Sequence, residues 1–237
     1  MFCMATDVLT MENLRWASDV GMVFLPIVGY VPQYIDIMRS KSSEGFSSHV
    51  SLILLVSNIL RIYFRIGKTY PSALLMQSLV MIAAQMLLLH RICAYSPPAH
   101  RGKRFSLVDW SAFWAWGSFW SYAQFVVAFA AVAAAVTALF GHSAAFFELL
   151  GLVSTLIESG IGLPQLWHNC ALRSTRGLSA ILIATWVVGD AFKTMYFVMT
   201  ASPVQFTLCG FLQISVDLLI VAQIIVFHSG QKPALGW

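Results

Sequence analysis

The sequence predicts an all-helical, polytopic membrane protein whose seven transmembrane helices form two parallel three-helix repeats joined by a linker helix. Three observations predict this fold class. First, 59% of the 237 residues are hydrophobic and only 10% are charged, whereas soluble domains contain about 25% charged residues. Second, the hydrophobic residues fall in runs of about 20, the length that crosses the roughly 30 Å hydrocarbon core of a bilayer. Third, the sequence repeats itself without gaps at an offset of 132 residues.

Seven apolar runs, each bounded by charged or turn-forming residues, define the expected spans. They cover residues 17–38, 47–67, 72–92, 113–140, 144–168, 178–199 and 204–228. The segment before the first run contains Asp7 and Glu12 and lacks the basic start and cleavage site of a secretory signal peptide. We therefore expect the first run to remain in the mature protein.

The basic residues predict the orientation. An odd number of spans places the two termini on opposite sides of the membrane. Nine Lys or Arg residues fall in the loops and tail on the side of the C-terminus, against three on the side of the N-terminus. Because cytoplasmic loops carry the excess of basic residues, the N-terminus is predicted to be luminal and the C-terminus cytoplasmic. The same residues are a topology signal and predict no nucleic-acid partner.

The fourth run is longer than one span and begins with many aromatic side chains. We interpret this start as a membrane-interface belt that leads into an Ala-rich helix. The alternative is a stacking platform for a ligand. The aromatic residues are Phe113, Trp114, Trp116, Phe119, Trp120, Tyr122 and Phe125.

The internal repeat is the most informative feature. Each copy contains three helices, so the fourth, non-repeated span restores the orientation and the two copies should be related by an axis along the membrane normal. The matched pairs are Pro32-Gln33 with Pro164-Gln165, Gly45 with Gly177, Asn58 with Asp190, Arg61 with Lys193 and Pro71 with Pro203.

The repeat and the spans together predict five parts of the chain. These are a luminal N-terminal segment (1–16), a first three-helix repeat (17–94), a cytoplasmic loop and linker helix (95–143), a second three-helix repeat (144–228) and a cytoplasmic tail (229–237).

The two Pro-Gln pairs are predicted to form hinges. A proline inside a helix donates no backbone hydrogen bond and crowds the carbonyl four residues earlier, so the carbonyls of Val28 and Gly160 should be free. The neighbouring glutamines are candidates to bond them. The alternative is a kink without function. The predicted hinge residues are Pro32, Gln33, Pro164 and Gln165.

A short polar segment follows each Pro-Gln helix. Gly45 and Gly177 are expected to supply a turn with positive φ, and Ser47 and Ser179 are expected to cap the next helix.

Polar side chains deep in the second helix of each repeat suggest a transport pathway. Asn58 and Asp190 fall near the bilayer midplane, and Arg61 and Lys193 lie one turn further on. Ionisable groups at this depth normally face the bundle interior or water and mark a pathway. The alternative is a self-neutralising Asp190–Lys193 pair, with Arg61 extending to the luminal surface beside Arg65.

Two further carboxylates, Glu158 and Asp217, lie within helices, and either could titrate if it is buried. Asp217 falls at the position of Gln85 in the first repeat, whereas Asp36 is interpreted as a solvated helix cap. The predicted pathway residues are Asn58, Arg61, Glu158, Asp190, Lys193 and Asp217.

The sequence predicts no catalytic residue, metal or cofactor. The four cysteines are scattered singly without metal-ligand spacing. No phosphate-binding loop or nucleophile elbow is present. An enzyme is therefore not expected.

The chain resembles the PQ-loop family. The resemblance covers almost the whole chain, although the loop near 95–110 is shorter than expected. The matching stretches are Val31-Pro-Gln-Tyr-Ile-Asp36, Asn58-Ile-Leu-Arg61, Gly162-Leu-Pro-Gln165, Gly189-Asp-Ala-Phe-Lys-Thr194 and Gln231-Lys-Pro-Ala234. The family includes lysosomal cystine and cationic amino-acid exporters and is related in fold to sugar-transporting proteins and secretory-pathway cargo receptors.

The resemblance implies residence in endosomal and trans-Golgi membranes and a role linked to phospholipid asymmetry and endosome-to-Golgi traffic. The leading expectation is therefore movement of phospholipid between leaflets, with membrane lipids as partners. One alternative is a proton-coupled transporter of a small polar solute such as an amino acid, and another is a trafficking receptor or adaptor whose cytoplasmic loops bind other proteins. The oligomeric state is left open.

Overall fold

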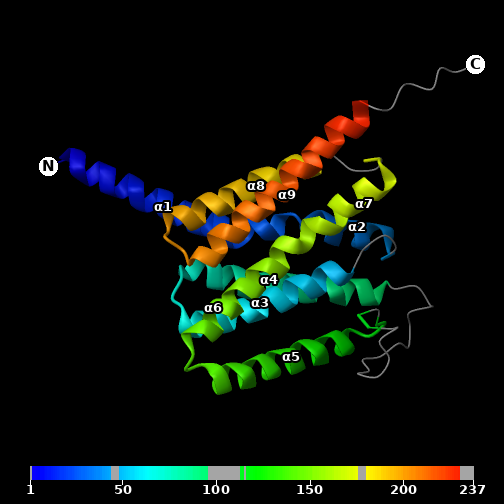
Figure 1. Ribbon diagram of the computed structural model, residues 1–237, viewed down its shortest axis with the longest axis horizontal. Coiled ribbons are helices and arrows are strands. Elements are labelled where there is room, and N and C mark those ends of the chain that lie inside the picture. Colours follow the sequence, from blue (N-terminus) through cyan, green and yellow to red (C-terminus); the bar gives the residue numbers. More distant parts are fainter. Residues whose placement is uncertain (1, 44–47, 96–112, 115, 176–179, 230–237) are drawn as a thin grey trace, which may run out of the picture. The chain divides into compact units, whose positions relative to one another are not determined.

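The computed structural model describes residues 2–43, 48–95, 113–114, 116–175 and 180–229. All regular structure in these ranges is helical (Figure 1). Seven segments of this part of the chain are long and apolar enough to cross a membrane, which confirms the predicted fold class. They are Met11–Ser40, Ser48–Gly67, Ser72–Ala94, Phe119–Phe140, Ala144–Leu172, Leu182–Met199 and Val204–Phe227.

The chain divides into two compact units, Met1–Ser154 and Thr155–Trp237. The division falls inside helix α6, eleven residues after the predicted start of the second repeat at residue 144. The first unit contains α1 (Phe2–Val28), α2 (Val31–Ser40), α3 (Ser48–Gly67), α4 (Ser72–Ala94), α5 (Phe119–Phe140) and the first part of α6 (Ala144–Ser159). The second unit contains the end of α6, η3 (Gly160–Gly162), α7 (Leu163–Leu172), α8 (Ala180–Met199) and α9 (Val204–Ser229).

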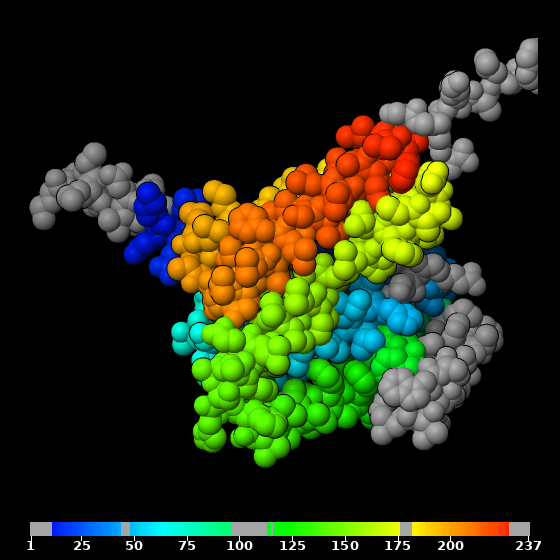
Figure 2. All heavy atoms as spheres, viewed as in Figure 1, coloured from blue at the N-terminus to red at the C-terminus, as the bar shows by residue number. Residues whose placement is uncertain are grey.

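Helix–helix packing within each unit brings distant parts of the sequence together. In the first unit α4 packs against α1, α2 and α3, and α5 packs against α3 and α4. In the second unit α9 packs against α7 and α8. The α7 and α9 helices adjoin along the molecular face seen in Figure 2. Each unit therefore places its Pro-Gln helix, α2 or α7, against the third span of its repeat, which is α4 or α9.

Two glycines in the first unit allow aromatic rings to approach the backbone. A Cβ on Gly151 of α6 would lie 2.7 Å from the ring of Phe64 in α3. A Cβ on Gly67 at the end of α3 would collide with the ring of Phe147 in α6. Glycine is therefore required at both positions for α6 to pack as closely as it does.

Each Pro-Gln pair begins a helix and does not lie inside one. Helix α1 ends at Val28 and α2 begins at Val31, so Pro32 occupies the first turn of α2. In the second unit η3 separates α6 from α7, and Pro164 occupies the first turn of α7. Proline is well tolerated there because the first N–H groups of a helix have no partner within it.

This arrangement corrects the prediction that the carbonyl of Gly160 would be free. The backbone N–H of Leu163 donates to the Gly160 carbonyl in a tight 3₁₀ turn. The chain thus tightens before the proline and satisfies the carbonyl with a donor three residues later. The amide of Gln165 bonds Asn169 and not this carbonyl.

The backbone turn after each Pro-Gln helix has the same conformation in both units. Lys41 ends α2 with φ 51°, and Arg173 ends α7 with φ 46°. These residues are related by the offset of 132, so the left-handed cap is part of the repeat. The predicted turns at Gly45 and Gly177 and the predicted caps at Ser47 and Ser179 lie outside the described residues.

The start of the aromatic run precedes a helix and is packed inside the first unit, so the interface-belt interpretation was wrong for its central residues. Helix α5 begins only at Phe119. Trp114, Trp116 and Tyr122 are buried in one core cluster with residues of α2, α3 and α4. The indole N–H of Trp114 donates to the Ser48 carbonyl at 2.6 Å, and the Ser48 hydroxyl donates back to the Trp114 carbonyl at 3.1 Å. These bonds hold Trp114 at a φ of 61°, which non-glycine residues seldom adopt.

Candidate functional site

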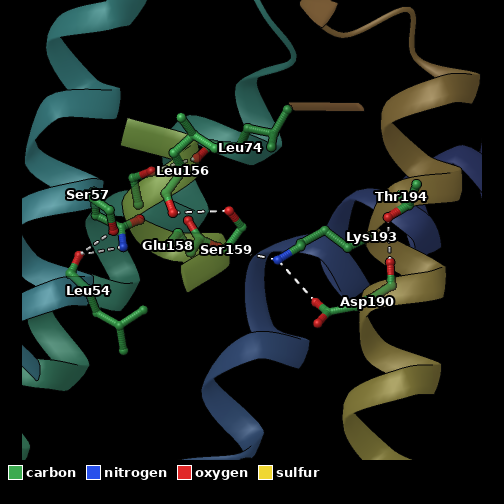
Figure 3. A network of polar contacts seen from close by, with 11 residues as sticks. Leu54, Ser57, Leu74, Leu156, Glu158, Ser159, Asp190, Lys193 and Thr194 are labelled. Atoms are coloured by element: carbon green, nitrogen blue, oxygen red, sulfur yellow. Dashed lines mark hydrogen bonds and ion pairs between the residues drawn. The ribbon is translucent and has the colours of Figure 1, made fainter. Parts of the chain in front are cut away.

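A polar cluster lies inside the second unit, centred on Lys193 (Figure 3). The Lys193 ammonium lies 3.2 Å from Oδ1 of Asp190, one turn earlier in α8, and 3.3 Å from Oε1 of Glu158 in α6. The Lys193 and Glu158 side chains are each 11% exposed. One ammonium therefore bridges two carboxylates from two helices.

Asp217 of α9 extends this cluster. The Asp217 side chain is buried, at 4% exposure, and its Oδ2 atom has no hydrogen-bond partner in the described part of the chain. Helix α9 packs against α8, the helix that carries Asp190 and Lys193. The cluster thus brings together three carboxyl groups and one ammonium.

The helix backbone also contributes to the cluster. The Thr194 hydroxyl donates to the Asp190 carbonyl at 2.7 Å. Gly210 of α9 lies against Thr194, and a Cβ at this glycine would come 2.5 Å from the Thr194 hydroxyl oxygen. The absence of a side chain at Gly210 allows α8 and α9 to approach where the acidic residues lie.

The equivalent positions of the first unit are polar but carry no carboxylate. Asn58 and Gln85 correspond to Asp190 and Asp217 by the offset of 132. The Asn58 amide donates to the Leu54 carbonyl at 2.8 Å, and the Ser51 hydroxyl donates to Gln85 Oε1 at 2.8 Å. Both amide side chains are at most 2% exposed. The same depth is therefore neutral in the first unit and acidic in the second.

Arg61 is buried in the first unit, with 3% of its surface exposed. The Tyr70 hydroxyl donates to the Arg61 backbone carbonyl at 2.8 Å. The guanidinium carbon of Arg65 lies 4.9 Å from the centroid of the Tyr70 ring, and Arg65 Nη1 is buried without a hydrogen-bond partner among the described residues. Burial corrects the alternative in which Arg61 extends to the surface.

Tyr70 lies between α3 and α4, outside both spans, and the sequence analysis did not single it out. Burial raises its pKa to about 12, against the lowering influence of Arg61 and Arg65. The neutral phenol is therefore maintained beside two guanidinium groups. In the sequence, only its place directly before Pro71 could have drawn attention to Tyr70, because a residue before proline is restricted to extended backbone conformations.

The structure brings together four of the six predicted pathway residues: Glu158, Asp190, Lys193 and Asp217. Asn58 and Arg61 lie in the other unit. The alternative of a self-neutralising Asp190–Lys193 pair was incomplete because Lys193 also bonds Glu158. Sequence spacing revealed Asp190 and Lys193 as neighbours on one helix, but it gave no sign that a glutamate 35 residues earlier would join them.

The predicted hinge residues differ between the units. Gln165 donates to Asn169 Oδ1 at 2.8 Å, whereas Gln33 is exposed and makes no side-chain hydrogen bond to the described part of the chain. Both prolines are exposed. Asp36, expected to be a solvated cap, is also exposed.

Within the described residues no group of three or more His, Cys, Asp or Glu side chains has the geometry to hold a metal ion. Among the described cysteines, Cys93, Cys170 and Cys209 are free thiols.

Seven apolar helices, two of them broken at a Pro-Gln pair, and ionisable side chains inside the helical core define a multi-pass membrane protein of the transporter type. Residues 16–74 and 146–206 each match the PQ loop repeat, and these two regions make up just over half of the chain. The chain belongs to the PQ-loop repeat family.

Two known proteins show the breadth of this relationship. Scramblase ANY1 of Saccharomyces cerevisiae is 24% identical over an alignment that covers 91% of this chain and 71% of the yeast protein. A solved structure of a eukaryotic SWEET transporter is 12% identical and matches with a TM-score of 0.59 over 90% of this chain and 96% of that one. The second likeness is one of fold. The family match and the similarity to the yeast scramblase support a membrane role of the transporter or scramblase kind.

Proposed function

We propose that this protein moves phospholipids between the two leaflets of a membrane without nucleotide hydrolysis. The observation that carries the proposal is the similarity to Scramblase ANY1, which extends over 91% of this chain. The sequence contains no phosphate-binding loop that could couple the movement to ATP. Movement would then run down the gradient of lipid composition, and it needs no catalytic residue.

Arg61 and Arg65 of the first unit are suited to a phospholipid headgroup. A guanidinium binds phosphate oxygens with two parallel N–H donors. Helices α3, α4 and α5, which pack on one another, contain no Asp or Glu. A phosphate that approached Arg65 would therefore meet no carboxylate from these three helices.

Reconstitution into liposomes tests the proposal. Purified protein is incorporated into vesicles that contain a fluorescent phospholipid, and a membrane-impermeant reducing agent is added outside. We expect nearly complete bleaching with the protein present. Bleaching that stops at the outer-leaflet half, as in protein-free vesicles, would refute the proposal.

A second candidate function is proton-coupled transport of a small polar solute such as an amino acid. The specific observation that favours it is the cluster of Glu158, Asp190, Asp217 and Lys193, in which one ammonium pairs with two carboxylates and the Asp217 Oδ2 atom is buried without a hydrogen-bond partner among the described residues. Its protonation could alternate as a solute passes. Solute-driven acidification inside the same vesicles, followed with a pH-sensitive dye, separates this function from lipid movement.

The cellular proposal is residence in endosomal and trans-Golgi membranes, with a luminal N-terminus and a cytoplasmic C-terminus, in support of endosome-to-Golgi traffic. The charge bias of the loops supports this orientation. Protease protection of tags at the two ends in sealed vesicles tests it, because both tags on one side would refute it. The trafficking-receptor alternative concerns loops that lie largely outside the described residues.

A further inference from the structure

The two units share a tertiary contact whose chemistry differs completely between them. In the first unit, Nε of Arg91 in α4 donates to the Tyr34 hydroxyl in α2 at 3.1 Å. In the second unit, Nε2 of Gln223 in α9 donates to the Leu166 carbonyl in α7 at 3.0 Å. The offset of 132 residues pairs Tyr34 with Leu166 and Arg91 with Gln223. The contact is thus repeated although neither residue pair is.

In the second unit this contact is part of a chain of amide groups. Gln165 donates to Asn169 Oδ1 at 2.8 Å, and Asn169 donates to Gln223 Oε1 at 2.9 Å. Gln223 Nε2 also lies 2.9 Å from the Cys170 thiol. Asn169 is 1% exposed. This series of hydrogen-bonded amide groups therefore begins at Gln165 of the Pro-Gln pair and ends at Gln223 on α9.

In the first unit an apolar cluster replaces the amide chain. Ile37 occupies the position of Asn169 and is fully buried among Leu88, Leu89 and Trp114. The guanidinium carbon of Arg91 lies 5.9 Å from the centroid of the Tyr34 ring. Tyr34 thus provides both a hydrogen-bond acceptor and a ring face to the same arginine.

The lengths of α2 and α7 show why these contacts matter. Each helix has only ten residues, and an isolated helix shorter than about 12–15 residues is marginal even with favourable residues. Before each proline the regular α-helical hydrogen bonding is interrupted, and a tighter bond takes its place, from Tyr30 to Ile27 in the first unit and from Leu163 to Gly160 in the second. The position of α2 or α7 therefore depends on what holds it to α4 or α9.

We infer that Arg91 and Gln223 are positioning residues that clamp each Pro-Gln segment to the third helix of its own repeat and thereby limit how far the segment swings. This inference rests on the proposed function and on the predicted hinge role of the two Pro-Gln pairs in it. By the predicted topology both clamps lie toward the cytoplasmic ends of their helices. The two clamps differ in chemistry, because an arginine bonds a tyrosine hydroxyl in the first unit and a glutamine bonds a backbone carbonyl in the second.

A distance measurement tests the second clamp without any transport assay. Spin labels are placed at Trp167→Cys on α7 and Val226→Cys on α9, which are 78% and 63% exposed. The four native cysteines are replaced in every variant. The comparison is between Gln223→Leu and Gln213→Leu, because both remove one amide from α9 but Gln213 makes no side-chain hydrogen bond within the described residues.

We expect electron–electron resonance to give a narrow distance distribution for the parent and for Gln213→Leu. Gln223→Leu removes the bonds to Leu166 and Asn169. It should increase the share of a displaced population at least about five- to tenfold, the factor that corresponds to the net contribution of one hydrogen bond. Equal distributions for Gln223→Leu and Gln213→Leu would overturn the inference. Because no transport is measured, failure of lipid movement in the wild-type protein leaves this result interpretable.

A reversible lock provides the second measurement. Gln223→Cys puts a thiol on α9 at the position whose amide reaches Cys170 of α7, with the other native cysteines replaced. Oxidation should join α7 to α9, as mass spectrometry of a digest would show, and should abolish transport until a reductant is added. The control combines Gln223→Cys with Cys170→Ala and should not respond to oxidant. Failure of the two thiols to join, or full transport in the joined protein, would refute the clamp.

Discussion

The Lys193 ammonium lies 3.3 Å from the carboxylate of Glu158 on α6, a helix that the sequence gave no reason to connect with it. The same ammonium lies 3.2 Å from Asp190. Lys193 is therefore shared between two carboxylates, so its ion pairing involves three residues rather than two.

The first prediction concerns this shared ammonium. Lys193→Met should lower the free energy of unfolding by about 1.5–3 kcal/mol, because it removes charge-assisted hydrogen bonds and leaves two carboxylates without their cation. The double variant Asp190→Asn with Lys193→Met should recover little, since Glu158 still lacks the ammonium that it pairs with. Adding Glu158→Gln should restore most of the loss, as measured by thermal unfolding in detergent. Full recovery in the double variant would contradict the bridging role of Glu158.

Transport by the same triple variant separates structure from mechanism. If these three residues contact a headgroup, solute or proton, the triple variant should fold normally and transport poorly. Normal stability together with normal transport would reduce the cluster to a structural role.

The second prediction concerns the Pro-Gln hinges. Pro164→Ala combined with Gly160→Ala should allow α6 to continue into α7, because alanine favours helix at both positions and the added Cβ at Gly160 meets nothing closer than 3.9 Å. We expect retained or increased thermal stability with reduced lipid movement in vesicles. Pro32→Ala should act in the same direction in the first unit. Full activity in these variants would leave the prolines as kinks without function.

The third prediction concerns close packing of α6. Gly151→Ala should destabilise the protein by about 1–3 kcal/mol, because the new Cβ would lie 2.7 Å from the Phe64 ring. Gly189→Ala on α8 is the control, since nothing lies within 4 Å of its added Cβ. That change should be neutral or stabilising by up to about 1 kcal/mol. Adding Phe64→Leu to Gly151→Ala should recover part of the loss, and an absence of coupling between the two sites would count against the contact.

The fourth prediction concerns the pH dependence that Tyr70 confers. Its pKa is about 12 in the folded protein and about 10 in the unfolded chain. The folded state therefore binds the proton more tightly, so the contribution of Tyr70 is complete below pH 10 and is lost as the pH rises toward 12. The difference in tyrosinate absorbance between wild type and Tyr70→Phe should show one group that titrates near pH 12. A midpoint near pH 10 would show that the phenol is not buried.

The fifth prediction concerns Arg61. Arg61→Leu should reduce lipid movement, because the guanidinium is a buried donor for phosphate oxygens. Arg15→Leu, at an exposed position of α1, should have little effect. Comparing zwitterionic and anionic fluorescent lipids in the same vesicles would reveal whether the loss depends on headgroup charge. Equal activity of the Arg61→Leu and Arg15→Leu proteins would remove Arg61 from the pathway.

The sequence by itself determined the number of spans, the existence of two repeats and the positions of the Pro-Gln pairs. These features depend on apolar length and on residue identity at a fixed offset, which are properties of the chain read in order. The predicted midplane depth of Asn58 and Asp190 rests in the same way on their distance along a helix.

Only the tertiary structure decided which side chains meet. Lys193 with Glu158, and Gln223 with Asn169, join helices separated by more than 30 residues, and their contact depends on the rotation and register of packed helices. The break before each proline was also hidden, because a proline is compatible both with a kinked helix and with the first turn of a new one. The length of a helix follows from the residues within it. Which side of a helix contacts its neighbours depends on packing against helices elsewhere in the chain.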